Sequence, residues 1–467
     1  MDSSAGSSSD CLRAAGLSDA AVADWTAARQ GQAAEFERDR QAYSHFWQRS
    51  DDLLGHLPPK PRRSGAEAAA AEAILTTARD HRECFLAAHG KVLYDRLTRH
   101  RSVFVRLEEL VFEAAAAVPG LTPARERVAA ENARPQRDKD GIEIDQGLFL
   151  AHMLADERSG FHLCHAMLLP RPEATELLPK LAADGLVDLG KATVERCGKA
   201  VLVTMKNPRY LNAEDETTLD LMEIAVDLAI LDPTSEIAVI RGGVLDHPRY
   251  RGRRVFGSGI NLTHLYRGQI PFIWFLQRDL GFVHKLLRGV ARPDVIPDDL
   301  QGRGIEKPWI AAVDGFAIGG HCQILLTMDY VVAANDAFMT LPARKEGIIP
   351  GLANLRLPRF TGDRIARQAI QYERKLVCDS PDGRLVCDEI VEADEMDTAI
   401  GRLVDGLTNA GAVSAIGNRR AFRVVEEPLD LFRRYCSAYA RDQAYCCFSP
   451  ALIANLERNW NAHNRTI

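Results

Sequence analysis

The sequence lacks any apolar run close to the roughly 20 residues that a membrane-spanning helix needs. It also lacks an excess of positive charge, because 58 Lys and Arg residues face 64 Asp and Glu residues and leave a net charge of -6. That balance disfavours a protein that binds nucleic acid over its whole surface. The opening segment MDSSAGSSSDCLRAAG has no apolar core of the kind that a secretory signal contains. We therefore expect a globular protein of the cytoplasm.

Few features of the sequence indicate a disulfide, a metal or a bound cofactor. The ten cysteines include no CxxC pair, so we expect reduced thiols, most of them in the core. His162, Cys164 and His165 lie close together without the spacing of a zinc site, which favours a structural role. A non-haem iron site needs two histidines and a carboxylate, yet residues 191–390 contain no HxD or HxE pair, Rossmann glycine pattern or P-loop. Residues 191–390 therefore contain no sequence pattern that indicates a bound metal or organic cofactor.

The pattern of apolar residues divides the chain into three regions. Residues 1–190 are predicted to form a helical domain, of which residues 1–15 are Ser-rich at their start and expected to be disordered. In residues 191–390, short apolar runs such as Trp309–Val313 alternate with helical patterns, as buried parallel strands do in α/β proteins. Residues 391–467 are predicted to form a helical tail. The predicted fold class is thus an α/β core with helical regions on both sides.

A glycine-rich segment, Gly315–Gln323 (GFAIGGHCQ), follows a predicted strand and opens a predicted helix. Its adjacent glycines, Gly319 and Gly320, allow the backbone to approach a ligand closely. The first N–H groups of a helix are unpaired and carry partial positive charge, which suits an anion that develops during a reaction. A tight turn without function would have the same local pattern. A second glycine-rich turn, Val255–Leu262 (VFGSGINL), makes the functional interpretation stronger.

Two further segments complete a set of four, namely Pro208–Ala213 (PRYLNA) and Gly347–Gly351 (GIIPG). Taken in chain order, the four segments cover about residues 195–372. Together they resemble the crotonase (enoyl-CoA hydratase/isomerase) superfamily. The resemblance implies a spiral of ββα turns and assembly into trimers or dimers of trimers, which are hexamers. It also implies that the backbone N–H groups of Ile260 and Gly320 form an oxyanion hole for an acyl-CoA thioester. Near them it places three more substrate-site residues: Asn212, Gly259 and Gly319.

Hydratases of this superfamily use two glutamates as acid and base, and this sequence lacks both. Gln323 occupies the first position, where an amide cannot exchange a proton near neutral pH. Ala343 occupies the second position when the segments are aligned on Gly347 and Pro350. Glu346 is the nearest substitute, but it is out of register. Addition of water to an enoyl-CoA is therefore not expected.

The long helical N-terminal region and the segments GSGINL and GGHCQ are similar to one branch of this superfamily. That branch oxygenates dihydroxyphenylacetyl-CoA during the synthesis of dihydroxyphenylglycine for antibiotics, without a metal or an organic cofactor. The resemblance implies that the thioester enolate reacts with O2 and yields 3,5-dihydroxyphenylglyoxylate and CoA. As catalytic residues we expect Ile260, Gly320, Arg278 and Gln323.

Further side chains are expected at the substrate. Glu214, Arg278 and Gln323 are candidates for binding the ring hydroxyls. Alternatively, Glu214 is a carboxylate at the start of a helix, Arg278 forms a surface ion pair, and Gln323 only packs against its neighbours. Ile348 is a candidate for an apolar oxygen pocket or plain core. Arg254, in an arginine-rich loop, suits a CoA phosphate or a solvated surface.

Two other functions remain open at this point. Another crotonase-type enzyme, such as an acyl-CoA hydrolase or decarboxylase, would use the same oxyanion hole without O2. A non-catalytic acyl-CoA-binding protein would explain the missing glutamates. Such a binder, however, has no need of two oxyanion turns for affinity alone.

Overall fold

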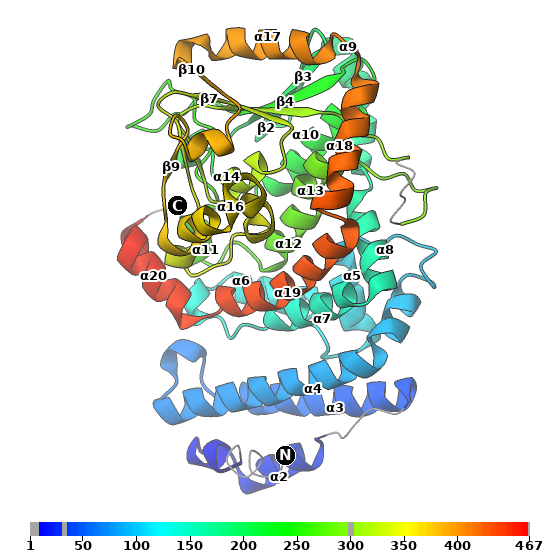
Figure 1. Ribbon diagram of the computed structural model, residues 1–467. Coiled ribbons are helices and arrows are strands. Elements are labelled where there is room, and N and C mark those ends of the chain that lie inside the picture. Colours follow the sequence, from blue (N-terminus) through cyan, green and yellow to red (C-terminus); the bar gives the residue numbers. More distant parts are fainter. Residues whose placement is uncertain (1–8, 30–34, 298–302, 466–467) are drawn as a thin grey trace. The chain divides into compact units, whose positions relative to one another are not determined.

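The computed structural model of the protein describes residues 9–29, 35–297 and 303–465 (Figure 1). The chain forms two compact units. The helical unit comprises the described residues of Met1–Leu163, Arg267–Ile273 and Cys436–Phe448. The sheet unit comprises those of Cys164–Tyr266, Trp274–Tyr435 and Ser449–Ile467.

The domain limits expected from the sequence, at residues 190 and 390, stay a prediction. Of the segment 1–15, where disorder is expected, residues 1–8 lie outside the described residues, and residues 9–14 are helical.

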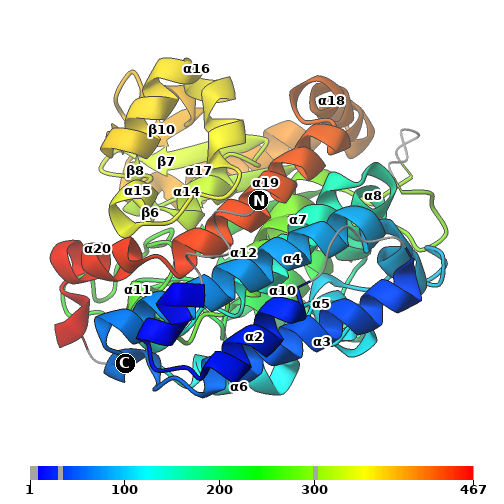
Figure 2. The same cartoon turned by 90° about the horizontal axis from the view of Figure 1, so that it is seen from below.

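In the helical unit, α3 and α4 lie side by side in both views (Figures 1 and 2). The start of α4 is fixed by a capping box, because Ser64 Oγ accepts from the Glu67 N–H and the Glu67 carboxylate accepts from the Ser64 N–H. Trp47 is fully buried and donates its indole N–H to Ala78 O at 3.2 Å. The helices are α2 (Asp19–Ala27), α3 (Phe36–Gly55), η1 (Lys60–Arg62), α4 (Gly65–Leu97), α5 (Leu107–Ala117), α6 (Arg125–Asn132), η2 (Gln136–Asp138) and α7 (Ile144–Ala155). Three more helices, α8 (Glu157–Leu168), α12 (Ile273–Leu280) and α19 (Leu429–Cys447), contribute residues to both units.

The segment Arg267–Ile273 belongs to the helical unit although its sequence neighbours on both sides belong to the sheet unit. Two buried charged side chains bind its backbone. Lys139 Nζ donates to Gly268 O at 2.8 Å, and the Phe272 N–H donates to Glu143 Oε2 at 2.6 Å. Burial raises the pKa of Glu143 to about 7, against the opposing charge of Lys139.

The sheet unit contains a seven-stranded sheet in the order β1-β2-β3-β4-β5-β7-β10. The pairs β1-β2 and β2-β3 are antiparallel, and the other neighbours are parallel. Its strands are β1 (Leu186–Asp188), β2 (Ala192–Cys197), β3 (Ala200–Met205), β4 (Ile237–Gly242), β5 (Trp309–Val313), β7 (Tyr330–Ala334) and β10 (Glu389–Val391). A smaller sheet has the order β6-β8-β9, with strands β6 (Phe316–Ile318), β8 (Phe338–Thr340) and β9 (Leu376–Val377).

The sheet unit also contains helices before, between and after these strands. In chain order they are α9 (Pro172–Asp184), η3 (Pro208–Tyr210), α10 (Leu219–Leu231), α11 (Leu262–Tyr266), α12 (Ile273–Leu280), α13 (Phe282–Arg288), α14 (Gly320–Leu325), α15 (Ala343–Glu346), α16 (Ala353–Tyr372), η4 (Gly383–Leu385), η5 (Ala393–Glu395), α17 (Met396–Thr408), α18 (Ala412–Glu426), α20 (Pro450–Trp460) and η6 (Ala462–Asn464). None of the helices in the described ranges is both long and apolar enough to cross a membrane.

The centre of the large sheet explains the apolar runs in the sequence. Every residue of β4 and β5 is buried, as expected for parallel strands covered on both faces. Met205 pairs with Gly242 at the carboxyl ends of β3 and β4, so the loops that follow these strands leave the sheet at one edge. The predicted α/β class with helical flanking regions is confirmed.

Candidate active site: two glycine turns and a buried arginine

The two glycine-rich turns predicted to bind a ligand lie against each other. Gly259 has φ +80° and Gly319 has φ +54°, a backbone region that favours glycine. A Cβ atom placed on Gly259 would lie 2.8 Å from Ile318 O and 3.3 Å from Gly320 N. Glycine at 259 therefore allows the turn before Ile260 to contact the start of α14.

The turn Val255–Leu262 pairs with Glu214 in a way that leaves the Ile260 N–H without an acceptor in the described part of the chain. The Glu214 N–H donates to Gly259 O at 2.8 Å, and the Asn261 N–H donates to Glu214 O at 2.7 Å. Consecutive N–H groups of an extended chain point in opposite directions, so the Ile260 N–H points away from Glu214. Among the described residues, neither the Ile260 N–H nor the Gly320 N–H has a hydrogen-bond acceptor. Both residues are only half-buried, so a ligand can reach these donors.

His321 holds the two turns together, a role that the sequence did not reveal. Its Nδ1 accepts from the Gly259 N–H at 2.9 Å, and its ring packs edge-on against Phe256. Complete burial lowers the pKa of His321 to about 4, so the ring is neutral at physiological pH and Nδ1 remains an acceptor. A Cβ atom on Gly257 would lie 2.3 Å from this ring. The acceptor lies 62 residues from its donor, a distance at which sequence spacing gives no signal.

Arg278, on α12, is the centre of a buried hydrogen-bonded group. Its Nε donates to Glu214 Oε1 at 2.8 Å, and its Nη2 donates to Gly320 O at 2.7 Å. Its Nη1 donates to Asp279 Oδ1 and to Gln323 Oε1, both at 2.8 Å. These contacts use four of the five N–H donors of the guanidinium. The structure thus brings together Glu214, Arg278, Gln323 and Gly320, four of the residues expected at the site.

The second carboxylate oxygen of Glu214 is buried without a hydrogen-bond partner. A Cβ atom on Gly320 would lie 2.2 Å from this Oε2 atom, which places the free oxygen beside the Gly320 Cα. His321 Nδ1 lies 3.9 Å from the same oxygen but accepts from Gly259 instead. An unsatisfied buried carboxylate oxygen is costly, so a ligand that donates a hydrogen bond to it would be favoured.

Asn212 fixes the loops behind the turns. Its φ is +55°, and its side chain is buried. The amide nitrogen donates to Gly243 O at 2.9 Å and to Val255 O at 3.0 Å, while its oxygen accepts from the Asn207 N–H at 2.9 Å. These contacts assign Asn212 to the support of the site.

Comparison with known proteins identifies the family. Residues 291–415 match the family model described as enoyl-CoA hydratase/isomerase. The chain is 46% identical to (3,5-dihydroxyphenyl)acetyl-CoA 1,2-dioxygenase of Amycolatopsis orientalis over 419 residues, which cover 90% of this chain and 95% of that protein. The chain belongs to the enoyl-CoA hydratase/isomerase family. The family predicted from the four segments is thereby confirmed.

Other proteins to which the chain is similar match only part of it. Carnitinyl-CoA dehydratase of Salmonella enteritidis PT4 is 26% identical over 51% of this chain and 83% of its own length. Among solved structures, an enoyl-CoA hydratase from Mycobacterium avium subsp. paratuberculosis K-10 is 20% identical, with a TM-score of 0.47, and covers 58% of this chain and 99% of its own. An enoyl-CoA hydratase from Bacillus halodurans has the same TM-score at 15% identity, with 58% of this chain and 100% of its own covered.

Two predicted site residues lie outside the group around Arg278. Arg254 is half-buried and lines an open cavity of about 350 Å³ together with Arg241, Asp314 and Asp397. Arg241 pairs with both of these aspartates, whereas Arg254 Nη1 makes a long contact of 3.4 Å to a backbone oxygen. Ile348 is half-buried in the turn after α15. Neither side chain has a hydrogen bond to the group within the described part of the chain.

Asp215, Glu216 and His264 offer ligand atoms close enough for a metal ion. Asp215 Oδ2, however, already accepts from the side-chain amides of Asn207 and Asn261, and His264 Nδ1 contacts Glu216 at 2.9 Å. These contacts fit a structural role for the group, because a metal would have to displace them.

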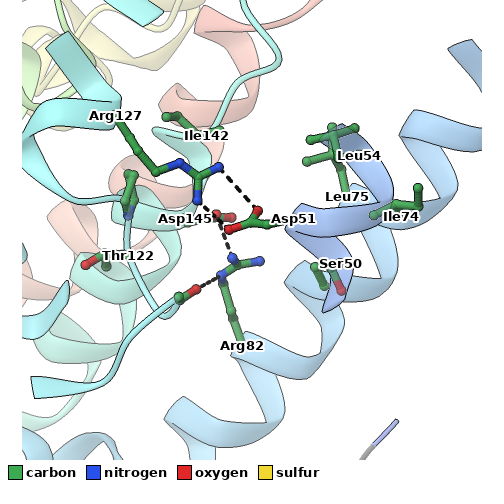
Figure 3. Close-up of a pocket in the computed structure, with 13 residues that line it drawn as sticks. Ser50, Asp51, Leu54, Ile74, Leu75, Arg82, Thr122, Arg127, Ile142 and Asp145 are labelled. Atoms are coloured by element: carbon green, nitrogen blue, oxygen red, sulfur yellow. Dashed lines mark hydrogen bonds and ion pairs between the residues drawn. The ribbon is translucent and has the colours of Figure 1, made fainter. Parts of the chain in front are cut away.

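A separate cavity lies within the helical unit (Figure 3). It is lined by charged side chains that point toward one another, including Asp51, Arg82, Arg127 and Asp145. Its volume of about 20 Å³ is enough for about one water molecule. None of the predicted site residues lines it, and it is too small for an acyl-CoA.

Proposed function

We propose that this member of the enoyl-CoA hydratase/isomerase family is a dioxygenase. It converts 3,5-dihydroxyphenylacetyl-CoA and O2 to 3,5-dihydroxyphenylglyoxylate and CoA. The observation that carries the proposal is the 46% identity, over 90% of this chain, with a (3,5-dihydroxyphenyl)acetyl-CoA 1,2-dioxygenase. The geometry of the site supports it, because polar groups without partners adjoin two backbone donors.

The N–H groups of Ile260 and Gly320 bind the thioester oxygen. When a proton leaves the α-carbon, negative charge moves to this oxygen, and the two donors stabilise it. A single donor of this kind is worth about 100- to 1,000-fold in rate. Gly259 and Gly319 allow the thioester to approach the backbone, and His321 and Asn212 hold the turns in place.

The ring of the substrate lies near Glu214 and Gln323 in this proposal. The free Oε2 of Glu214 accepts a hydrogen bond from one ring hydroxyl. Gln323 directs its Oε1 to Arg278, which leaves its amide nitrogen to donate to a hydroxyl oxygen. Arg278 has one N–H, on Nη2, beyond its four protein contacts. Its main task is therefore to orient Glu214, Gln323 and the Gly320 carbonyl.

The reaction proceeds from the enolate. The carbanion, delocalised over the electron-rich ring and the thioester, transfers electrons to O2 and forms a C–O bond at the α-carbon. The distal peroxide oxygen attacks the thioester carbonyl, the C–S bond breaks, and CoA leaves. Loss of the remaining α-proton with cleavage of the O–O bond gives the keto acid. The protein supplies orientation, charge stabilisation and exclusion of water.

Other predictions complete the proposal. Arg254 binds a CoA phosphate, because three of the four carboxylates that line its cavity, Asp314, Asp336 and Asp397, are paired with other arginines. Ile348 lines the path of O2. No metal or organic cofactor takes part, the enzyme is cytoplasmic, and it assembles as a trimer or a dimer of trimers.

An oxygen electrode tests the proposal directly. The purified protein is incubated with 3,5-dihydroxyphenylacetyl-CoA and EDTA, and free CoA is measured with a thiol reagent. We expect one O2 to be consumed for each CoA released. Release of CoA without O2 uptake would identify a hydrolase, and the absence of both would exclude catalysis on this substrate.

A further inference from the structure

Asp279 is a buried carboxylate of the site that the proposed mechanism leaves without a task. It follows Arg278 on α12 and is only 2% exposed. Its Oδ1 accepts from Arg278 Nη1 at 2.8 Å. Arg278 thus lies between two carboxylates, because its Nε edge faces Glu214 at the same distance.

A second arginine lies near enough to Asp279 to favour its charged form. Burial raises the pKa of Asp279, and the positive charges of Arg278 and Arg356 oppose this shift. Arg356, on α16, is fully buried and binds both oxygens of Glu427 at 3.0 and 2.9 Å. Glu427 also accepts from Arg359 at 2.9 Å. Charges of alternating sign therefore extend from Glu214 through Arg278, Asp279 and Arg356 to Glu427.

We infer that Asp279 is a positioning residue that shares the charge of Arg278 and so keeps the second oxygen of Glu214 available for a ring hydroxyl. The inference rests on the proposed function, because it concerns the same ring-binding group. It adds a residue that determines specificity without contacting the substrate.

The geometry explains why one carboxylate would not suffice. A guanidinium and a carboxylate prefer to pair through two parallel hydrogen bonds, which use both oxygens. Glu214 contacts Arg278 through Oε1 only, because Nη1 is held by Asp279 and Gln323, and Nη2 is directed to Gly320 O. Without the charge of Asp279, Arg278 can turn toward Glu214 and bind Oε2 as well. The free acceptor at the ring would then be lost.

The test compares two ligands under anaerobic conditions, where no turnover occurs. Binding of 3,5-dihydroxyphenylacetyl-CoA and of phenylacetyl-CoA, which lacks both hydroxyls, is measured by calorimetry for the wild type and for Asp279→Asn. We expect the wild type to prefer the hydroxylated ligand. We expect Asp279→Asn to reduce this preference by about 10-fold or more, as for loss of one charge-assisted hydrogen bond, with unchanged affinity for phenylacetyl-CoA.

Two variants serve as references. Asp279→Glu keeps the charge and should retain part of the preference, which also provides a test if Asp279→Asn does not fold. Asp294→Asn removes the carboxylate of an exposed ion pair with Arg292 and should leave both affinities unchanged.

The inference is overturned if Asp279→Asn keeps the full preference, or if it weakens both ligands equally. Equal weakening of both ligands in Asp279→Glu would overturn it as well, and so would a wild type without any preference. Failure of the dioxygenase proposal is distinguishable, because it appears as missing O2 uptake in air while the anaerobic preference is still measurable.

Discussion

Two buried groups of charged side chains each contain a carboxylate oxygen without a hydrogen-bond partner among the described residues, and they differ in what lies beside that oxygen. In the helical unit, Asp145 Oδ2 lies 3.2 Å from Arg82 (Figure 3). Its Oδ1 has no hydrogen-bond partner but lies 3.6 Å from Arg79, so cations flank this carboxylate. In the sheet unit, Arg278 lies between two carboxylates, and the free oxygen of one of them, Glu214 Oε2, lies beside the Gly320 Cα. In the first group the carboxylate oxygens face arginines, whereas in the second group an acceptor faces the Gly320 turn.

This difference separates stability from function. A buried ion pair is strongly destabilised when one partner is removed, because the other charge remains in a medium of low polarity. A buried acceptor without a partner costs stability and persists where it serves another purpose. Changes in the first group should therefore act on folding, and changes in the second should act on the substrate.

The largest expected effect is that of Asp145→Ala on stability. The substitution leaves Arg79 and Arg82 buried without their carboxylate. We expect the free energy of unfolding to fall by about 3–5 kcal/mol, measured by denaturant titration. Asp184→Ala, which removes an exposed partner of Lys180, should cost only about 0–1 kcal/mol. A loss below about 1 kcal/mol for Asp145→Ala would show that this group does not hold the helical unit together.

Gly320→Ala should act on catalysis. The added Cβ would lie 2.2 Å from Glu214 Oε2 and 3.0 Å from Arg278 Nη2, so both side chains must shift. We expect kcat/KM for O2 uptake to fall by about 100-fold or more. Gly401→Ala, where a Cβ meets nothing within 4 Å, is the matched control and should leave the rate unchanged. Activity of Gly320→Ala within a few-fold of wild type would rule out this arrangement.

Glu143→Gln should change how stability depends on pH. Its pKa in the folded protein, about 7, exceeds the ordinary value of 4.5. The stabilisation by the protonated form is therefore complete below pH 4.5 and is lost as the pH rises through 7. We expect the variant to gain about 1–3 kcal/mol relative to wild type between pH 5 and pH 8, measured by urea unfolding at both pH values.

The control for this pH experiment is Glu126→Gln, at an exposed position of α6. Its free energy of unfolding should change between the two pH values by the same amount as that of the wild type. An equal change in the free energy of unfolding for Glu143→Gln and wild type would show instead that Glu143 is ionised in the folded protein throughout this range.

The smallest effect is expected from Gln323→Glu on hydration. The variant restores the first carboxylate of a hydratase, but Ala343 still offers no second one. We expect no efficient hydration of crotonyl-CoA. Hydration is measured as the loss of absorbance of the enoyl thioester. Rapid hydration would mean that another group, such as Glu346, supplies the missing carboxylate.

The sequence predicted those parts of the site that local patterns encode. Paired glycines after a strand indicate a turn that exposes N–H groups, and the resemblance to the crotonase superfamily led us to expect the oxyanion donors at Ile260 and Gly320. The α/β core was visible because fully buried strands such as β4 and β5 give continuous apolar runs. Glu214, Arg278 and Gln323 were selected by chemistry and family resemblance, and the structure brings them together.

The remaining parts depend on contacts between distant segments. His321 accepts from a residue 62 positions earlier, and no periodic pattern marks such a pair. Asn212 was expected near the substrate, yet its amide is occupied by three backbone groups of separate loops. The packing of Arg267–Ile273 into the helical unit likewise depends on Lys139 and Glu143, more than 120 residues away.

The most direct test of the central claim uses isotopically labelled oxygen. The enzyme is supplied with 18O2 and 3,5-dihydroxyphenylacetyl-CoA in unlabelled water, and the product is analysed by mass spectrometry before its keto group exchanges with the solvent. The account predicts two labelled atoms in the glyoxylate product, one in the keto group and one in the carboxylate. A product that carries no label, or release of unlabelled 3,5-dihydroxyphenylacetate with CoA, would contradict it.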